Sequence, residues 1–501
     1  MDILQTMQAI MQPSVLLFML VGVIVGTLIG ALPGLSVVMA IALFTPITFL
    51  LEPTQGLAML IGIYNAGVWA GGISAVLINT PGTPASIMST LDGYAMTQRG
   101  EAGLGLGINT VYSVIGGIFS SIVLMFAAFP IANFALNFGP AEYAMLAFFG
   151  LSMIISVSGK ELLKGVIVGL FGLLIATVGT DVMFGNARYT LGVMELRNGI
   201  PFIPVMIGLF GIGEILDQIT QIGKEEPTAS FKGKIGRILP TGKQFRNWLP
   251  ATGLSAVIGV IVGAIPGTGG DIASIVSWDQ ARRISKDKEN YGKGSPEALA
   301  VTCLSNNAVI GGAMTTMMAL GIPGDGVTAV LIGSLMMYSV RPGPMMFIEQ
   351  RPMVLNIMGL MIVANLFILL VGLATAKSSA KMLNRLSKPT IWIVVAILCL
   401  VGSYAISNSL VDVWIAFAAG ILGFIFRKTN MPLAPFVLAI ILGPMFEANL
   451  RRTLTITGGS YAIFVTNPIS LVLLVLSILS FISAIYRSSK AKRKTAEEAQ
   501  A

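Results

Sequence analysis

The stretch from Val25 to Phe44 reads VGTLIGALPGLSVVMAIALF, and the stretch from Ile258 to Trp278 reads IGVIVGAIPGTGGDIASIVSW. Both are apolar enough to lie in a bilayer, yet each carries a Pro-Gly pair near its middle. Proline removes a backbone donor and glycine relaxes the backbone, so each pair is expected to end a helix. The same helix-ending motif thus occurs twice, at an offset of 233 residues.

The rest of the chain has the composition of a membrane protein. Of its 501 residues 55% are hydrophobic and only 11% are charged, with a mean hydropathy of +0.84. A soluble globular protein has roughly a quarter of charged residues. Many apolar runs reach the roughly 20 residues that a helix needs to span hydrocarbon. We therefore expect an all-α polytopic membrane protein.

Several function classes are excluded by what the sequence lacks. There is no histidine, the commonest metal ligand, and no Walker-type phosphate loop for nucleotide hydrolysis. The two cysteines, Cys303 and Cys399, lie in apolar runs and are interpreted as buried small side chains. The net charge of +8 comes mostly from loops and one tail, which positive-inside topology explains without a nucleic-acid partner. No catalytic residue and no cofactor are expected, apart from a coupling ion.

The chain divides into two similar halves. We predict a first membrane repeat over 1–217, a basic cytoplasmic linker over 218–248, a second membrane repeat over 249–486 and a basic cytoplasmic tail over 487–501. Four matched pairs carry the duplication, the last three at an offset of 242: Gly30–Gly34 with Gly263–Gly267, Gln55–Ala58 with Glu297–Ala300, Asn65-Ala66 with Asn307-Ala308, and Thr80–Gly82 with Ile322–Gly324. The slip of nine residues falls in a charged loop, where insertions are tolerated.

Charge asymmetry predicts the topology. The linker, the tail and the loop Arg282–Lys293 are basic and are therefore expected in the cytoplasm. The segment 248–278 must then enter and leave on one side, as a re-entrant helical hairpin. The first-half loop LLEPTQG has no Lys or Arg, so the hairpin over 14–50 is expected to enter from the outside, with a periplasmic N-terminus. The two repeats would have inverted topology, which is common in secondary transporters.

We expect about eleven crossings in addition to the two hairpins, and two of these crossings, the first and the sixth, are long and interrupted. Their expected ranges are 57–97, 103–135, 141–157, 161–180, 200–217, 297–340, 353–375, 390–408, 411–427, 433–447 and 465–486. In this arrangement six arginines are expected on the outer side of the membrane: Arg188, Arg197, Arg341, Arg351, Arg451 and Arg452.

Four Pro-Gly breaks carry the expected chemistry: ALPGLS (31–36), NTPGTPAS (79–86), AIPGTGGD (264–271) and GIPGDGVT (321–328). Irregular backbone is tolerated at membrane depth only inside protein or beside a watery cavity. The breaks should therefore converge on a substrate cavity near the midplane. The alternative for each break is an ordinary kink, because Gly and Pro are frequent in membrane helices.

The breaks contain no Lys or Arg, so a carboxylate ligand would be held by helix N-termini, hydroxyls and amides. The candidate substrate-binding residues are Pro33, Gly34, Ser36, Asn65, Pro81, Gly82, Thr83, Ser86, Gly267, Thr268, Gly269, Asn307, Pro323, Gly324 and Thr328.

Asp271 and Asp325 are the two acidic residues at the breaks, both in the second repeat. An intramembrane carboxylate is costly and is a functional candidate by default, here for binding Na⁺ or a proton. The alternative is helix N-capping, which Asp often performs just after a break. The two roles can coexist. If one tip carries the cation, the second hairpin, with Asp271, is the preferred one.

The motifs GALPGLS, NTPGTPAS, GAIPGTGGDIASIVSW, GIPGDGVTAVLIGSL and RPGP (341–344) together resemble the large membrane subunit of the tripartite tricarboxylate transporters, the TctA family. The resemblance covers essentially the whole chain. It implies a secondary transporter of the bacterial inner membrane that imports di- or tricarboxylates such as citrate. It also implies Na⁺ or H⁺ coupling, a small membrane subunit of the TctB type and a periplasmic solute-binding protein of the TctC type.

Other functions stay open at this point. A channel would need neither paired broken helices nor inverted repeats, and a scaffold would have no substrate path of its own. An intramembrane aspartyl protease would use two Asp residues, but the surroundings of Asp271 and Asp325 do not match the usual G-x-G-D motif. Within the carrier hypothesis, movement of the hairpin-bearing part against a scaffold is expected by analogy with elevator carriers.

Overall fold

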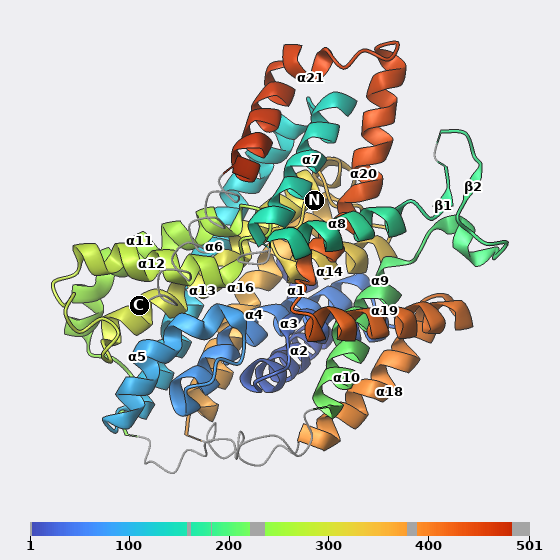
Figure 1. Cartoon of the computed structure of the whole chain (residues 1–501). Coiled ribbons are helices and arrows are strands. Elements are labelled where there is room, and N and C mark those ends of the chain that lie inside the picture. The colour runs from blue at the N-terminus through green and yellow to red at the C-terminus, as the bar shows by residue number, and fades with distance from the viewer. Residues whose placement is uncertain (1–2, 158–161, 182, 221–235, 378–387, 483–501) are drawn as a thin grey trace, which may run out of the picture. The chain divides into compact units, whose positions relative to one another are not determined.

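The computed structural model describes residues 3–157, 162–181, 183–220, 236–377 and 388–482. These residues are almost entirely helical (Figure 1). A short hairpin, in which β1 (Gly179–Thr180) pairs antiparallel with β2 (Ala187–Arg188), is the one sheet among them. The expected all-α fold is therefore confirmed.

Nine helices among the described residues are long and apolar enough to cross a membrane. They cover Pro13–Ala31, Pro53–Ile78, Ala102–Ala135, Phe202–Ile219, Gly242–Gly263, Pro296–Leu320, Arg351–Thr375, Leu410–Lys428 and Ala434–Ile456. Shorter apolar helices cover Val37–Thr48, Leu162–Ala176, Gly326–Met337, Trp392–Ser407 and Pro468–Ile482. The chain is thus a multi-pass membrane protein.

The chain forms two compact units, and each takes one segment from either half of the sequence. Unit 1 contains residues 1–132 and 219–402, and unit 2 contains residues 133–218 and 403–501. The division into repeats over 1–217 and 249–486 is a statement about sequence duplication, and it stays a prediction. The predicted linker lies partly outside the described residues, at 221–235, and the predicted tail over 487–501 lies wholly outside them.

Unit 1 holds both hairpins and both interrupted helices. Its elements from the first half are α1 (Ile3–Ile10), α2 (Pro13–Ala31), α3 (Val37–Thr48), α4 (Pro53–Ile78), η1 (Pro84–Ser86), α5 (Ile87–Gln98) and most of α6 (Ala102–Ala135). Those from the second half are α11 (Gly242–Gly263), α12 (Gly269–Ile284), α13 (Pro296–Leu320), α14 (Gly326–Met337), α15 (Met346–Glu349), α16 (Arg351–Thr375) and most of α18 (Lys388–Ser407). The predicted helix ends at the four breaks agree closely with these bounds.

Glycines set the helix packing in both halves of unit 1 in the same way. α2 packs closely along α4, and α11 packs along α13. A side-chain carbon on Gly30 would overlap the carbonyl oxygen of Gly67, and one on Gly263 would overlap that of Val309. Gly30 and Gly263 lie 233 residues apart in the sequence, and their partners Gly67 and Val309 lie 242 residues apart. These are the same two offsets that relate the matched sequence segments. This duplicated contact supports the predicted internal repeat, whereas its inverted orientation stays a prediction.

The two halves interlock within unit 1 through the short helices that follow the breaks. α3 packs against α14, where the hydroxyls of Thr45 and Ser334 lie 2.7 Å apart. α12 packs against η1, and the Ser274 hydroxyl donates a 3.3 Å hydrogen bond to the Ala85 carbonyl. Each hairpin therefore contacts the interrupted helix of the other half.

Among its described residues unit 2 is mostly helical, and the β1–β2 hairpin lies between α8 and η2. Its remaining elements are α7 (Pro140–Val157), α8 (Leu162–Ala176), η2 (Glu195–Asn198), α9 (Phe202–Met206), the π-helical η3 (Ile207–Ile212), α10 (Gly213–Ile219), α19 (Leu410–Lys428), α20 (Ala434–Ile456) and α21 (Ile463–Thr466). α20 packs against α7 and α8, and α19 packs against η3.

One helix is longer than the crossing predicted within it. The crossing expected over 433–447 is part of α20, which continues to Ile456. Arg451 lies one turn after Glu447 on this helix and donates a 3.1 Å hydrogen bond to the Glu447 carboxylate. Pairing at a spacing of four residues neutralises both groups and favours continued helix.

Candidate functional site

All four predicted breaks lie in unit 1, between α2 and α3, α4 and η1, α11 and α12, and α13 and α14. Pro33, Gly34, Pro81, Gly82, Gly267, Pro323 and Gly324 occupy the non-helical connections, whereas Gly269, Ser86 and Thr328 lie in the helices that restart. The backbone of two breaks meets directly, because the Gly267 N–H donates a 2.7 Å hydrogen bond to the Gly324 carbonyl.

The start of α14 is closed by side chains. Asp325 is the N-cap of this helix, and its Oδ1 accepts hydrogen bonds from the Thr328 N–H and hydroxyl, both at 2.8 Å. Its Oδ2 accepts a 2.5 Å hydrogen bond from the Tyr64 hydroxyl, which comes from α4. The capping role that the sequence left open for Asp325 is therefore the one observed here. The Ser36 hydroxyl caps α3 in a similar way, accepting from the Met39 N–H at 3.1 Å.

The start of α12 is arranged differently. Its N-cap, Thr268, makes no side-chain cap, because the Thr268 hydroxyl donates backwards to the carbonyls of Val262 and Ile265 at 2.5 and 2.9 Å. Asp271 lies in the first turn of the helix and is partly exposed. Backbone N–H groups at a helix start attract anions when no cap satisfies them. This helix start thus lacks the side-chain cap that closes α3 and α14, although the Asp271 carboxylate accepts from the N–H groups of Asp271 and Ile272 in its first turn.

The loop from the first half supplies the opposite wall of this position. Gly270 packs so tightly that an added side-chain carbon would lie 2.6 Å from Asn306 Oδ1 and 2.8 Å from Ala85 Cβ. The neighbouring Ser86 hydroxyl donates to the Thr83 carbonyl at 2.8 Å, and both residues are buried. The second hairpin tip, the loop 79–86 and α13 therefore meet around the start of α12.

Buried asparagines form the third part of the site. The Asn307 side-chain amide donates a 3.4 Å hydrogen bond to the main-chain carbonyl of Asn65. The Asn365 side-chain amide donates a 3.3 Å hydrogen bond to Asn65 Oδ1. Within the described part of the chain, no donor reaches the buried Oδ1 atoms of Asn306, Asn307 and Asn365. A buried acceptor without a partner costs about 1–3 kcal/mol, so these three oxygens are candidate ligands for a donor or a cation.

Three residues of this arrangement were missed from the sequence. Tyr64 and Asn306 directly precede the predicted Asn65 and Asn307, and Asn365 is a polar residue in the middle of the apolar helix α16. An amide in the middle of a spanning segment is the signal that could have identified Asn365.

Comparison with known proteins identifies the family. The model of the tripartite tricarboxylate transporter TctA family matches residues 16–438. The chain belongs to the TctA family. Members of this family are transporter components rather than enzymes, and they work in a tripartite assembly with other subunits and a substrate.

Two relatives of this TctA chain come from Agrobacterium vitis. One is described as an uncharacterized 52.8 kDa protein in the TAR-I ttuC' 3' region, and it is 33% identical over 484 residues, which are 96% of this chain and 95% of the relative. The other, an uncharacterized protein in the TAR-II ttuC' 3' region, is 32% identical over 238 residues, which are 47% of this chain and 97% of the relative. No solved structure gives a significant match.

Proposed function

We propose that this TctA chain forms the substrate path of a cation-coupled importer of di- or tricarboxylates, with citrate as one candidate. The importer would act in the bacterial inner membrane with a small TctB-type subunit and a periplasmic TctC-type binding protein. The observation that carries the proposal is the meeting of α12 with the loop 79–86 in unit 1, where a helix start, hydroxyls and amides lie together in segments whose sequences contain no Lys or Arg.

A substrate carboxylate fits best at the start of α12. The N–H groups of Gly269 and Gly270 and the positive end of the helix dipole favour an anion there. Thr83 and Ser86 add hydroxyls from the facing loop. The other predicted binding residues would shape this position, including Asn65 and Asn307, and the Asn307 side-chain amide donates to the Asn65 main-chain carbonyl in the core.

Asp271 supplies the coupling in this proposal. Its carboxylate shares the first turn of α12 with the N–H groups that would hold the substrate. Two negative groups in one apolar site repel each other, so bound Na⁺ or a bound proton at Asp271 would favour substrate binding, and the reverse holds by linkage. Asp325 is less suited to this role, because Tyr64 and Thr328 already donate to its carboxylate.

Uptake into proteoliposomes tests the proposal. The chain would be reconstituted with its partner subunits and binding protein, and radiolabelled citrate uptake measured with an imposed Na⁺ gradient or pH gradient. We expect uptake to depend on one of the two gradients and Asp271→Asn to abolish that dependence. Asp279→Asn, on the same helix but half-exposed and paired with Arg283, should keep it.

The outcomes separate the alternatives. Uptake that ignores both gradients would contradict the coupled carrier, and non-saturating flux would indicate a channel. Normal uptake in Asp271→Asn with full gradient dependence would assign the coupling to another residue. Normal uptake after Thr83→Ala and Thr268→Ala would indicate that the substrate path lies elsewhere in the assembly.

A further inference from the structure

Unit 2 contains a cavity of about 230 Å³ that the proposed transport site does not use. It lies where the end of α8, the segments 178–180 and 183–200, and the middle of α20 come together. Its apolar wall includes Ile175, Ala176, Ile440 and Pro444. Its polar wall includes Arg188, Arg197, Asn198, Glu447 and Arg451.

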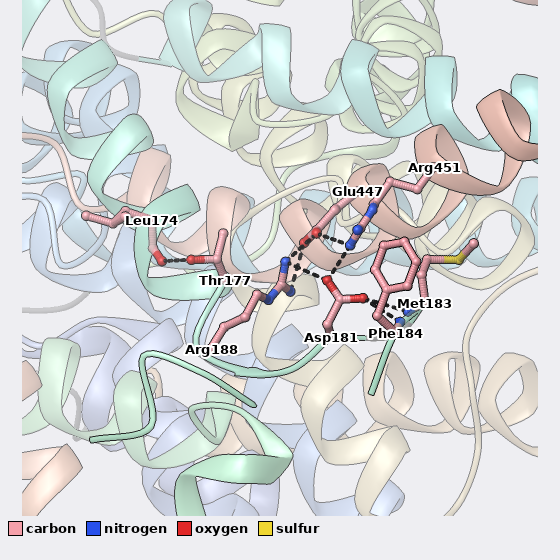
Figure 2. Close-up of polar contacts among 8 residues, drawn as sticks. All are labelled: Leu174, Thr177, Asp181, Met183, Phe184, Arg188, Glu447 and Arg451. Carbon is pink, nitrogen blue, oxygen red and sulfur yellow. Dashed lines mark hydrogen bonds and ion pairs between the residues drawn. The ribbon is translucent and has the colours of Figure 1, made fainter. Parts of the chain in front are cut away.

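Four charged groups beside the cavity neutralise one another, as Figure 2 shows. Arg188 donates to the two oxygens of Glu447 at 2.6 and 3.3 Å, and Arg451 donates to Asp181 at 2.5 Å. The Asp181 carboxylate also accepts hydrogen bonds from two loop N–H groups, those of Met183 and Phe184, at 2.8 and 2.9 Å. These contacts fix the positions of both guanidinium groups.

Arg197 leaves the cavity with a surplus positive charge. It is a third guanidinium on the wall, and no carboxylate among the described residues pairs with it. Its side chain is exposed, whereas Arg188 is held in place and has a buried Nε with no acceptor among the described groups. The site thus offers donors to an anion.

We propose that this cavity binds a small di- or tricarboxylate. Arginine forks match the geometry of a carboxylate, and Arg197 is the guanidinium on the wall that no carboxylate among the described residues occupies. The cavity is smaller than the roughly 300–1,000 Å³ that hold drug-sized ligands, so a small organic anion suits it. The apolar wall would face the carbon skeleton of the anion, and Asn198 would add an amide beside Arg197.

Protection of a cysteine from alkylation tests the site in the full-length protein. Asn198→Cys places a thiol on the cavity wall, and the two native cysteines are buried, at 1% and 0% exposure, so a neutral maleimide should label the new thiol selectively. We expect citrate at millimolar concentration to slow the labelling severalfold. Trimethyl citrate, which is neutral, should leave the labelling rate unchanged.

Matched arginine variants locate the effect. Arg197→Gln should raise the citrate concentration needed for protection about tenfold, because it removes a charge-assisted donor. Arg197→Lys should show a smaller shift. Arg452→Gln removes an arginine charge next to Arg451 but outside the cavity. In this control, citrate should protect the Asn198→Cys thiol as well as it does in the protein that carries only Asn198→Cys.

The result is independent of the proposed transport site. Asp271→Asn in unit 1 should leave the protection at Asn198→Cys unchanged, whatever its effect on uptake. Labelling that ignores citrate, or an equal loss of protection in Arg197→Gln and Arg452→Gln, would overturn the proposal. Equal protection by sulfate would indicate a general anion site rather than a carboxylate site.

Discussion

At the scale of single residues, buried polar groups in this apolar chain are held by partners far away in sequence. Asp92 on α5 is an example: its Oδ1 accepts from the N–H groups of Gly292, Gly294 and Ser295 at 2.8–3.0 Å, and its Oδ2 accepts from Trp278 at 3.0 Å. No local pattern in the sequence specifies these partners, which lie about 200 residues further along the chain. The contact ties the first half of unit 1 to the loop before α13.

Asp181 gives a prediction about pH. Hydrogen bonds from Arg451 and from the Phe184 N–H lower the pKa of its carboxyl to about 2. Because this pKa lies below the value of about 4 expected in the unfolded chain, the ionised form favours the folded state. The contribution of ionised Asp181 to the stability of the folded state is complete above about pH 4, and it is lost as the pH falls towards about 2.

The measurement is the thermal unfolding midpoint of the purified protein between about pH 6 and about pH 3. Asp181→Asn should lower the midpoint at the higher pH and flatten its decline on acidification. Asp279→Asn, which removes an exposed carboxylate, serves as the control. An unchanged pH profile in Asp181→Asn would show that these ion pairs add nothing to stability.

At the scale of elements, local residue types determine where helices end, and glycines that allow close contact determine how the helices pack. Pro-Gly pairs end α2 and α11 where the sequence predicts, since a missing N–H acts locally. Which restarted helix is capped could not be predicted. Thr268 turns its hydroxyl back towards α11, whereas Asp325 caps α14, and both choices depend on the surrounding contacts.

The packing of α11 against α13 gives a matched pair of glycine variants. Gly263→Ala should lower the unfolding midpoint, because the new methyl group would overlap the Val309 carbonyl, and overpacking costs about 1–3 kcal/mol. Gly253→Ala lies on the same helix with open space around it, and it should be neutral or stabilising through helix propensity. Thermal unfolding in detergent compares the two, and equal midpoints would contradict the close contact.

At the scale of the whole molecule, the chain builds two units from alternating segments of its sequence. Unit 1 collects the four breaks, and unit 2 collects the arginine-lined cavity. If unit 1 acts as one body during transport, contacts inside it should persist through the cycle. The expected elevator-type movement stays a prediction.

A cross-link inside unit 1 tests this. The hydroxyls of Thr45 and Ser334 lie 2.7 Å apart on α3 and α14, so Thr45→Cys with Ser334→Cys should form a disulfide after mild oxidation. We expect cross-linking at the same rate with and without citrate, and retained uptake in the oxidised protein. Uptake that is lost on oxidation and recovered by a reductant would show that α3 and α14 separate during transport.

The sequence by itself determined the membrane class, the four breaks and the duplicated segments, because Pro-Gly pairs and apolar length act locally. It also placed Asp271 and Asp325 at the breaks. Tertiary structure alone decided that α3 meets α14 and that α12 meets η1, and it brought Asn365 to Asn65. It likewise joined Asp181 to Arg451, which lies 270 residues further along the chain. These contacts depend on side chains packing across helices distant in sequence, which no local pattern specifies.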